Sequence, residues 1–365
     1  MIATQQLHKL GQSIWLDNIT RELLTNGTLT RYIRELSVTG LTSNPTIFDH
    51  AIQNSELYDD AIRQKKLEGK SGEELFFELA LEDLIQAADL FRSIHEATGG
   101  IDGWVSLEVS PLLADDAEGT IKAAEMLHGR AKRPNLFIKI PGTCAGIPAI
   151  EESIFAGVPV NVTLLFSCEH YMAAAEAYMR GIERRIAAGL DPKVFSVASI
   201  FVSRWDTAIK DKTPQVLHNR LGIAIANRVY KSFRELLASP RWQKLADAGA
   251  RPQRLLWGST GSKDPDVSDT LYIEALVAPD TINTMPDKTL LAFAGHGKVK
   301  TIMPSDGGDA EAVLAAFARV NVDDVVLAAK LQREGVQSFA ESWSDLIDCI
   351  SAKKCRSQTI STQCG

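Results

Sequence analysis

The chain alternates between short apolar runs and longer segments in which hydrophobic residues recur with a helical repeat. In the short runs, hydrophobic residues occupy adjacent positions rather than every second one, which is typical of parallel strands covered on both faces. The pattern predicts eight strands, at residues 13–17, 37–45, 103–110, 135–140, 159–166, 194–202, 254–257 and 276–282.

Helices are predicted between and after these strands. Residues 73–97 show the repeat best, with Leu75, Leu79, Leu84 and Leu90 spaced close to about 3.6 residues per turn. The other helices are predicted at residues 4–11, 18–36, 55–68, 117–127, 145–156, 169–189, 216–238, 310–317 and 324–350.

Strand–helix units of this number, in a chain of 365 residues, favour an α/β fold of one class, the (β/α)8 or TIM barrel. The helix before the first strand and the last helices are additions to it. The first strand is not followed by the Gly-x-Gly-x-x-Gly run of a dinucleotide-binding sheet, which weakens that alternative. We expect a single barrel over residues 1–350 and an unstructured tail at residues 351–365.

Polar residues follow the carboxyl ends of the predicted strands. In a TIM barrel these ends meet at one mouth, where the active site lies. The polar residues found there are Asp17 from the first strand, Thr42 and Asn44 from the second, Glu108 from the third, Lys139 from the fourth, Asn161 and Thr163 from the fifth, Ser199 and Arg204 from the sixth, and Ser259, Thr260 and Lys263 from the seventh. The pattern therefore predicts that they surround one cavity.

Lys139 lies inside an apolar run, between Ile138 and Ile140. Alone, such a lysine is an ordinary strand-end residue, with its ammonium in solvent or paired with a carboxylate. Beside two carboxylates it has a chemical use, because a neutral lysine amine forms an imine with a ketone and activates the adjacent carbon–carbon bond. Amide and hydroxyl side chains can bind a polyol, and Arg204, Lys263 and the glycine-containing loop after residue 257 can bind a phosphate.

Composition narrows the function classes. The formal net charge is −7 with basic residues scattered along the chain, which argues against a nucleic-acid surface. No apolar run approaches the roughly 20 residues that cross a membrane, and no secretory signal is recognisable, so we expect a cytoplasmic protein. The five cysteines and seven histidines show no metal-binding spacing, and we expect no metal.

Two runs resemble the transaldolase family. Residues 41–47, Leu-Thr-Ser-Asn-Pro-Thr-Ile, are similar to its N-terminal signature. Residues 137–142, Phe-Ile-Lys-Ile-Pro-Gly, continuing to residues 161–167, Asn-Val-Thr-Leu-Leu-Phe-Ser, are similar to its active-site signature. The resemblance extends over roughly residues 10 to 300 in motif order. The chain length and the opening at Trp15 and Asp17 resemble the longer bacterial subgroup of stand-alone transaldolases.

The resemblance implies a barrel enzyme of the class I aldolase type, in the non-oxidative pentose phosphate pathway, without metal or organic cofactor. It implies transfer of a dihydroxyacetone unit from sedoheptulose 7-phosphate or fructose 6-phosphate to glyceraldehyde 3-phosphate or erythrose 4-phosphate. The implied catalytic residues are the Schiff-base Lys139, the acid/base Asp17, and Glu108 acting through a water held with Thr163. The implied substrate-binding residues are Thr42, Asn44, Asn161, Ser199, Phe201, Arg204, Ser259 and Lys263.

One position departs from the family pattern: an arginine commonly follows the seventh strand, where this chain has Lys263. Lysine lacks the bidentate fork of arginine. Two other functions stay open, a fructose-6-phosphate aldolase that releases free dihydroxyacetone and a non-catalytic sugar-phosphate-binding barrel. Glu108 and Phe201 favour transaldolase, because the aldolases usually carry Gln and Tyr there. Cys144 is either a small loop residue or an oxidation-sensitive thiol, and the exposed helix faces fit either a homodimer or a monomer.

Overall fold

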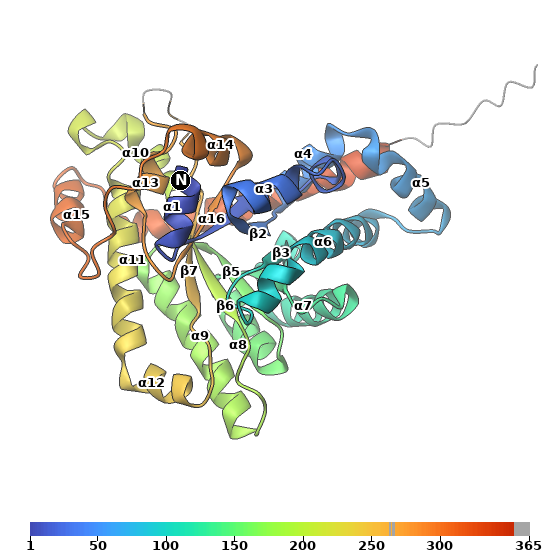
Figure 1. Ribbon diagram of the computed structural model, residues 1–365, viewed down its shortest axis with the longest axis horizontal. Coiled ribbons are helices and arrows are strands. Elements are labelled where there is room, and N and C mark those ends of the chain that lie inside the picture. Colours follow the sequence, from blue (N-terminus) through green and yellow to red (C-terminus); the bar gives the residue numbers. More distant parts are fainter. Residues whose placement is uncertain (263, 265–266, 354–365) are drawn as a thin grey trace, which may run out of the picture.

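Eight parallel strands form a closed barrel in sequence order, with the last strand paired to the first. The computed structural model describes residues 1–262, 264 and 267–353 (Figure 1). The strands are β1 (Ser13–Asp17), β2 (Val38–Thr42), β3 (Trp104–Glu108), β4 (Leu136–Pro141), β5 (Val160–Leu165), β6 (Ser196–Phe201), β7 (Arg254–Gly258) and β8 (Ile282–Met285). The predicted (β/α)8 barrel is confirmed.

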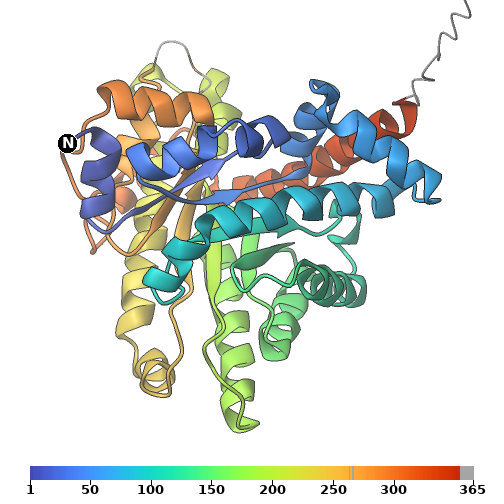
Figure 2. The same cartoon turned by 45° about the vertical axis from the view of Figure 1, so that its right-hand side comes forward.

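Helices surround the barrel, and two further helices follow the last strand–helix unit (Figure 2). The α-helices are α1 (Ala3–Lys9), α2 (Arg21–Thr25), α3 (Thr28–Leu36), α4 (Pro45–Gln53), α5 (Asp59–Leu67), α6 (Gly72–Ala97), α7 (Ala117–Ala131), α8 (Gly146–Ala156), α9 (Cys168–Ala187), α10 (Ser203–Ile209), α11 (Leu221–Ala238), α12 (Pro240–Asp247), α13 (Leu271–Ala275), α14 (Asp287–His296), α15 (Ala310–Ala318) and α16 (Asp324–Ala352). Short 3-10 turns lie at η1 (Glu56–Tyr58), η2 (Pro111–Leu113), η3 (Lys210–Lys212) and η4 (Gln215–Leu217). The long α16 packs along α4, as both views show.

The prediction for the last strand is wrong. We expected it at residues 276–282, but β8 begins at Ile282. Leu276 and Val277 are fully buried in the loop before it, so their hydrophobic character reflects packing outside the sheet. Pro279 and Asp280, which has a positive φ of 63°, turn the chain into the strand. The strand itself contains Asn and Thr and lacks the apolar pattern that identified the other seven.

Several helices differ from expectation as well. The short helices α4, α10, α12, α13 and α14 were not predicted. The helix expected at residues 216–238 begins as α11 at Leu221, after a separate 3-10 turn. The final helix ends at Ala352, so only residues 351–353 of the expected tail are described, and the first two of them are helical. The prediction for residues 354–365 lies outside the described part of the chain.

Aromatic side chains fill the lower half of the barrel interior. Trp15, Trp104 and Phe137 form a buried cluster there, in which the rings of Trp104 and Phe137 stack at 3.9 Å between centroids. Gly40 on β2 makes room for them, because a Cβ at this position would lie 2.7 Å from Trp15 Nε1. Side chains alternate in direction along a strand, so the next inward-facing positions lie above this layer, toward the carboxyl ends.

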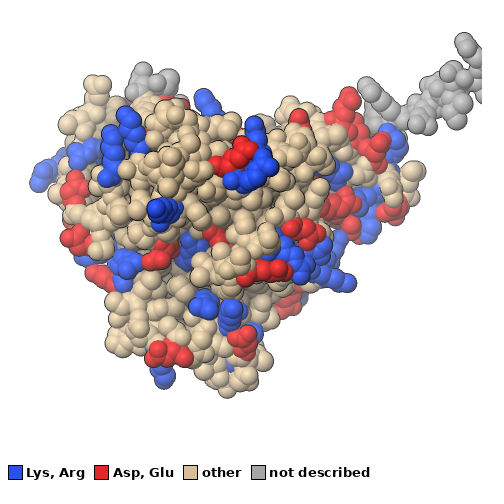
Figure 3. Space-filling view, in the orientation of Figure 1, with Lys and Arg blue, Asp and Glu red and all other residues tan. Residues whose placement is uncertain are grey.

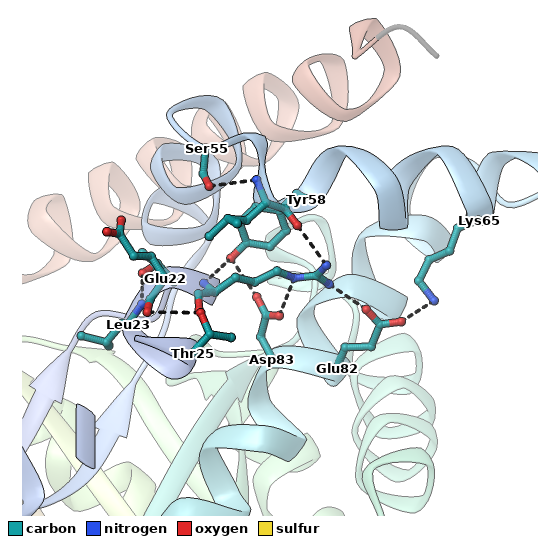
Figure 4. A network of polar contacts seen from close by, with 11 residues as sticks. Glu22, Leu23, Thr25, Ser55, Tyr58, Lys65, Glu82 and Asp83 are labelled. Carbon is teal, nitrogen blue, oxygen red and sulfur yellow. Dashed lines mark hydrogen bonds and ion pairs between the residues drawn. The ribbon is translucent and has the colours of Figure 1, made fainter. Parts of the chain in front are cut away.

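A polar network fixes the segment that follows β1. Arg21 at the start of α2 donates to Asp83 Oδ1 on α6 at 2.9 Å and to Glu82 Oε2 at 2.7 Å, and its guanidinium lies 4.6 Å from the ring centroid of Tyr58 (Figure 4). Tyr58 donates to the other oxygen of Asp83 at 2.8 Å. Asp83 is buried, so this pairing offsets the cost of its desolvation. The network joins α2, η1 and α6 close to the carboxyl end of β1.

Acidic and basic side chains are interspersed on the face shown in Figure 3. Many of them form surface ion pairs, such as Arg133 with Asp89 at 2.7 Å and Arg241 with Glu176 at 2.6 Å. Among the described residues, the helices are all too short or too polar to cross a bilayer.

Candidate active site

A cavity of about 220 Å³ opens at the carboxyl ends of the strands. Nine of the predicted site residues line it, namely Asp17, Thr42, Asn44, Lys139, Thr163, Ser199, Phe201, Arg204 and Ser259. They come from β1, β2, β4, β5, β6 and the segments that follow β2, β6 and β7. Residues far apart in the sequence are brought together because parallel strands of a barrel all end at the same mouth.

Lys139 is at the centre of the site. Its side chain is 6% exposed, and Nζ lies 3.0 Å from Oε2 of Glu108. The register of the sheet explains this neighbour, since Glu108 on β3 pairs directly with Lys139 on β4. Nζ also donates a hydrogen bond to the carbonyl oxygen of Ser43 at 2.9 Å. The amine is thus held by two oxygens from β3 and from the segment after β2.

Asp17 ends β1 and faces the cavity. Burial raises the pKa of its carboxyl group, while the hydrogen bond from Thr42 and the charge of Lys139 act in the opposite direction. Thr42 Oγ1 lies 2.7 Å from Asp17 Oδ1 and 2.8 Å from Oγ1 of Thr284. A carboxylate with a raised pKa, in contact with a cavity, is suited to accept and return a proton.

Burial also raises the pKa of the Glu108 carboxyl group. The charge of Lys139 lowers this pKa and partly offsets the effect of burial. Among the described residues, no hydrogen-bond partner reaches Glu108 Oε1 or the buried Oγ1 of Thr163. Buried polar atoms are normally paired, so these two oxygens are available to a small polar molecule. Glu108 does not line the cavity wall but lies directly behind the lysine amine.

Asn161 and Ser199 are linked beneath the cavity. Ser199 Oγ donates to Asn161 Oδ1 at 2.7 Å, and Asn161 Nδ2 donates to Ser106 Oγ at 3.1 Å. Ser199 lines the cavity, whereas Asn161 is fully buried and does not. Asn161 therefore orients Ser199 from below in the structure. Asn44 lines the cavity and also caps α4, because its Oδ1 accepts from the backbone of Ile47 at 3.0 Å.

Arg204 lies near the start of α10 and lines the cavity. Burial lowers the pKa of its guanidinium, and the charges of Glu108 and Asp17 act in the opposite direction. Ser203 places the loop after β7 beside it, since the hydroxyls of Ser203 and Ser259 are 2.9 Å apart. Ser259 has a left-handed backbone with φ of 53°, which a non-glycine residue rarely adopts. Lys263, the second predicted cation, lies outside the described residues.

The sequence did not reveal several residues that contribute to the site, and three of them show why. Thr284 lies on the strand whose position we predicted wrongly. Ser43 contributes a backbone carbonyl, which no side-chain pattern can indicate. Phe339 comes from α16, far along the chain, and only its place in the helical repeat distinguished it as a buried residue. Cys144, in the loop after β4, is a free and exposed cysteine that does not line the cavity.

A buried lysine paired with a carboxylate, in the mouth of a (β/α)8 barrel, is typical of aldolase-type enzymes that bind a carbonyl substrate as an imine. The sequence matches the model of the Transaldolase/Fructose-6-phosphate aldolase family over residues 14–350. The chain therefore belongs to this family.

Relatives of known function match over nearly the whole chain. The transaldolase of Frankia alni is 45% identical over 364 residues, which cover 97% of this chain and 98% of the relative. The transaldolase of Acidothermus cellulolyticus is 43% identical over 353 residues, 94% of this chain and 95% of the relative. The transaldolase of Thiobacillus denitrificans is 42% identical over 355 residues, which cover 95% of this chain and 99% of the relative. The predicted family and the function of a transaldolase, a transferase, are confirmed.

Proposed function

We propose that this protein transfers a dihydroxyacetone unit from sedoheptulose 7-phosphate or fructose 6-phosphate to glyceraldehyde 3-phosphate or erythrose 4-phosphate. The observation that carries the proposal is the buried pair of Lys139 and Glu108, 3.0 Å apart, behind a cavity that Asp17 also lines. This pair can produce a neutral amine by moving one proton from nitrogen to oxygen. The neutral amine is the form that attacks a ketone.

The reaction begins with attack of Lys139 Nζ on the keto carbon of the donor, which gives a carbinolamine. Loss of water then gives the iminium, and we propose that Glu108 supplies the proton to the departing hydroxyl through a water held with Thr163. The unpartnered Oε1 of Glu108 and Oγ1 of Thr163 support this relay. Both atoms are buried, so each gains a hydrogen bond when water bridges them.

Asp17 accepts the proton of the donor's C4 hydroxyl as the bond between C3 and C4 breaks. The electron pair of that bond moves to the iminium and forms an enamine, and the aldose phosphate leaves. An acceptor aldehyde then takes the electron pair of the enamine, while Asp17 returns the proton to the new hydroxyl. Hydrolysis of the iminium releases the product and restores the amine. The raised pKa of Asp17 suits it to both proton transfers.

The other cavity residues support binding of a phosphorylated polyol. Asn44 and Ser199 present polar groups to the hydroxyls of the three-carbon unit, and Asn161 supports Ser199 from below. Arg204 and Ser259 are suited to the terminal phosphate, since an arginine donates to phosphate in a bidentate manner. Lys263 stays a prediction for a second phosphate-binding cation.

Reduction with borohydride tests the imine. Treatment with fructose 6-phosphate and borohydride should fix the three-carbon unit to the peptide that contains Lys139, and a mass spectrum of the digest would show the increase. Lys139→Met, treated in the same way, is the control and should show none. An unmodified Lys139 peptide in the active enzyme would refute the Schiff-base assignment. Omission of the acceptor aldehyde from the activity assay separates transfer from release of free dihydroxyacetone.

A further inference from the structure

The guanidinium of Arg204 lies over two aromatic rings that come from distant parts of the chain. Its Cζ is 5.1 Å from the ring centroid of Phe201 on β6 and 5.7 Å from that of Phe339 on α16. Among the described residues, no carboxylate or other acceptor forms an ion pair or hydrogen bond with it. The two rings therefore order the cation by their π faces and leave its N–H donors available to a ligand.

One glycine of α16 lies close to Arg204. A Cβ at Gly335 would lie 2.9 Å from Leu164 Cδ2 and 3.4 Å from Nη1 of Arg204. An added Cβ would therefore displace the end of the Leu164 side chain and press against the guanidinium of Arg204. Gly335 lies one turn before Phe339, so the two residues face Arg204 from the same side of the helix.

Two polar side chains of α16, Gln332 and Ser342, hold the helix at the mouth of the barrel. Gln332 Nε2 donates to the carbonyl oxygens of Gly142 and Leu164, each at 3.0 Å. These carbonyls belong to the segment after β4 and to the irregular end of β5, where Leu164 has a positive φ of 58°. Ser342 forms a hydrogen bond of 2.8 Å with Thr46 on α4, a cavity residue. Gln332, Gly335, Phe339 and Ser342 all lie on one face, at spacings of three or four residues.

We propose that this face of α16 is the positioning surface for the phosphate-binding arginine, with Phe339 and Gly335 holding Arg204 ready for the substrate's phosphate. The proposal rests on the proposed function, in which Arg204 binds that phosphate. A cation held by a carboxylate would have to break an ion pair before it binds phosphate. A cation held by rings does not, so the binding free energy is not reduced by that rearrangement.

The proposal is tested by how strongly the enzyme prefers a phosphorylated donor over the same sugar without phosphate. We would measure kcat/KM for fructose 6-phosphate and for fructose, both with erythrose 4-phosphate as acceptor, and the inhibition constant of inorganic phosphate. Phe339→Leu should lower the ratio of the two kcat/KM values about tenfold through a higher KM for fructose 6-phosphate, and weaken phosphate inhibition similarly. The value for fructose should stay within about twofold of the unaltered enzyme. Phe91→Leu, which removes a buried ring from α6, is the matched control and should leave the ratio unchanged.

Gly335→Ala provides a second variant, with Gly129→Ala on α7 as its control, because a Cβ at Gly129 meets nothing within 4 Å. Equal losses with both donors in Phe339→Leu and Gly335→Ala would overturn the proposal and assign α16 a purely structural role. Arg204→Gln distinguishes the phosphate-binding role of Arg204 from the positioning role of α16. If Arg204→Gln leaves the ratio unchanged, the phosphate-binding role of Arg204 fails. If it lowers the ratio and the two α16 variants do not, only the positioning role fails. In the Arg204→Gln background, Phe339→Leu should have no further effect on the ratio.

Discussion

Replacing Lys139 by methionine should destabilise the protein as well as inactivate it. Lys139 and Glu108 are 6% and 3% exposed, and their charged atoms are 3.0 Å apart. Removal of one partner of a buried ion pair leaves the other charge uncompensated, at a cost of about 3–5 kcal/mol. With an unfolding entropy of about 2.1 cal/mol/K per residue, this corresponds to a fall in Tm of about 4–7 °C for the whole chain.

The effect should depend on pH. Without Lys139, the pKa of Glu108 loses the main influence that opposes its rise on burial. A carboxyl group with a raised folded-state pKa stabilises the protein below its unfolded pKa, here near 4.5, and this stability is lost as pH rises through the folded value. Lys139→Met should therefore melt closest to the unaltered protein at low pH and fall progressively below it toward pH 8.

A double variant tests how much of the loss comes from the charge of Glu108. Lys139→Met combined with Glu108→Gln removes both charges of the pair and should recover most of the lost Tm, because the carboxylate that Lys139 contacts directly is gone. The loss of the hydrogen bond to Ser43 is common to both variants, so their difference reports the charge alone. Lys330→Met, which removes an exposed pair with Glu334, is the control and should lower Tm by less than about 1 °C. Thermal melting followed by circular dichroism measures the Tm of each variant. A double variant that is no more stable than Lys139→Met at pH 8 would refute the reasoning.

Two further predictions concern the proton-transfer group and the end of β4. Thr42→Val removes the hydrogen bond that lowers the pKa of Asp17, so the acid limb of the kcat/KM profile should move to higher pH; an unmoved limb would contradict the role of Asp17 as base. Gly146→Ala would place a Cβ 1.9 Å from the carbonyl oxygen of Pro141 and should displace the end of β4, with a loss of about 1–3 kcal/mol and a fall in kcat of at least about tenfold. Equilibrium unfolding and steady-state kinetics would measure these losses, and kcat close to that of the unaltered enzyme would contradict the coupling.

Most of the barrel could be predicted because seven of its strands lie within or overlap short runs that contain hydrophobic residues. A parallel strand buried on both faces needs hydrophobic residues at adjacent positions, and its polar residues are then concentrated at one end. The run around Lys139 shows both features, which made it recognisable. The eighth strand lacks these features, since its inward-facing residue near the mouth is Thr284 and its outward-facing neighbour is Asn283. The hydrophobic pattern therefore pointed to the buried loop before it, which contains Leu276 and Val277.

The sequence indicated which residues lie at the mouth of the barrel better than it indicated how they contact one another. Strand ends indicate which residues share the mouth, but the contact between Glu108 and Lys139 depends on the register of β3 with β4, which a single sequence does not encode as a pattern. The position of Asn161 below the cavity likewise depends on depth along the strand. The contribution of Phe339 depends on how α16 packs across the barrel mouth, a contact between segments far apart in the sequence.

The aromatic layer and the reactive groups follow from the same strand geometry. Phe137 lies two residues before Lys139 on β4, and Trp15 lies two residues before Asp17 on β1, so in each strand an aromatic ring and a reactive group face inward at successive positions. On β3, Trp104 and Glu108 are separated by one further inward position, Ser106. The rings close the barrel below the charged groups and exclude water from that side. Burial raises the pKa of Asp17 and Glu108, and Trp15 and Trp104 supply apolar surroundings below them from the same two strands. The order of residues along each strand therefore contributes both to the packing of the barrel and to the environment of its carboxylates.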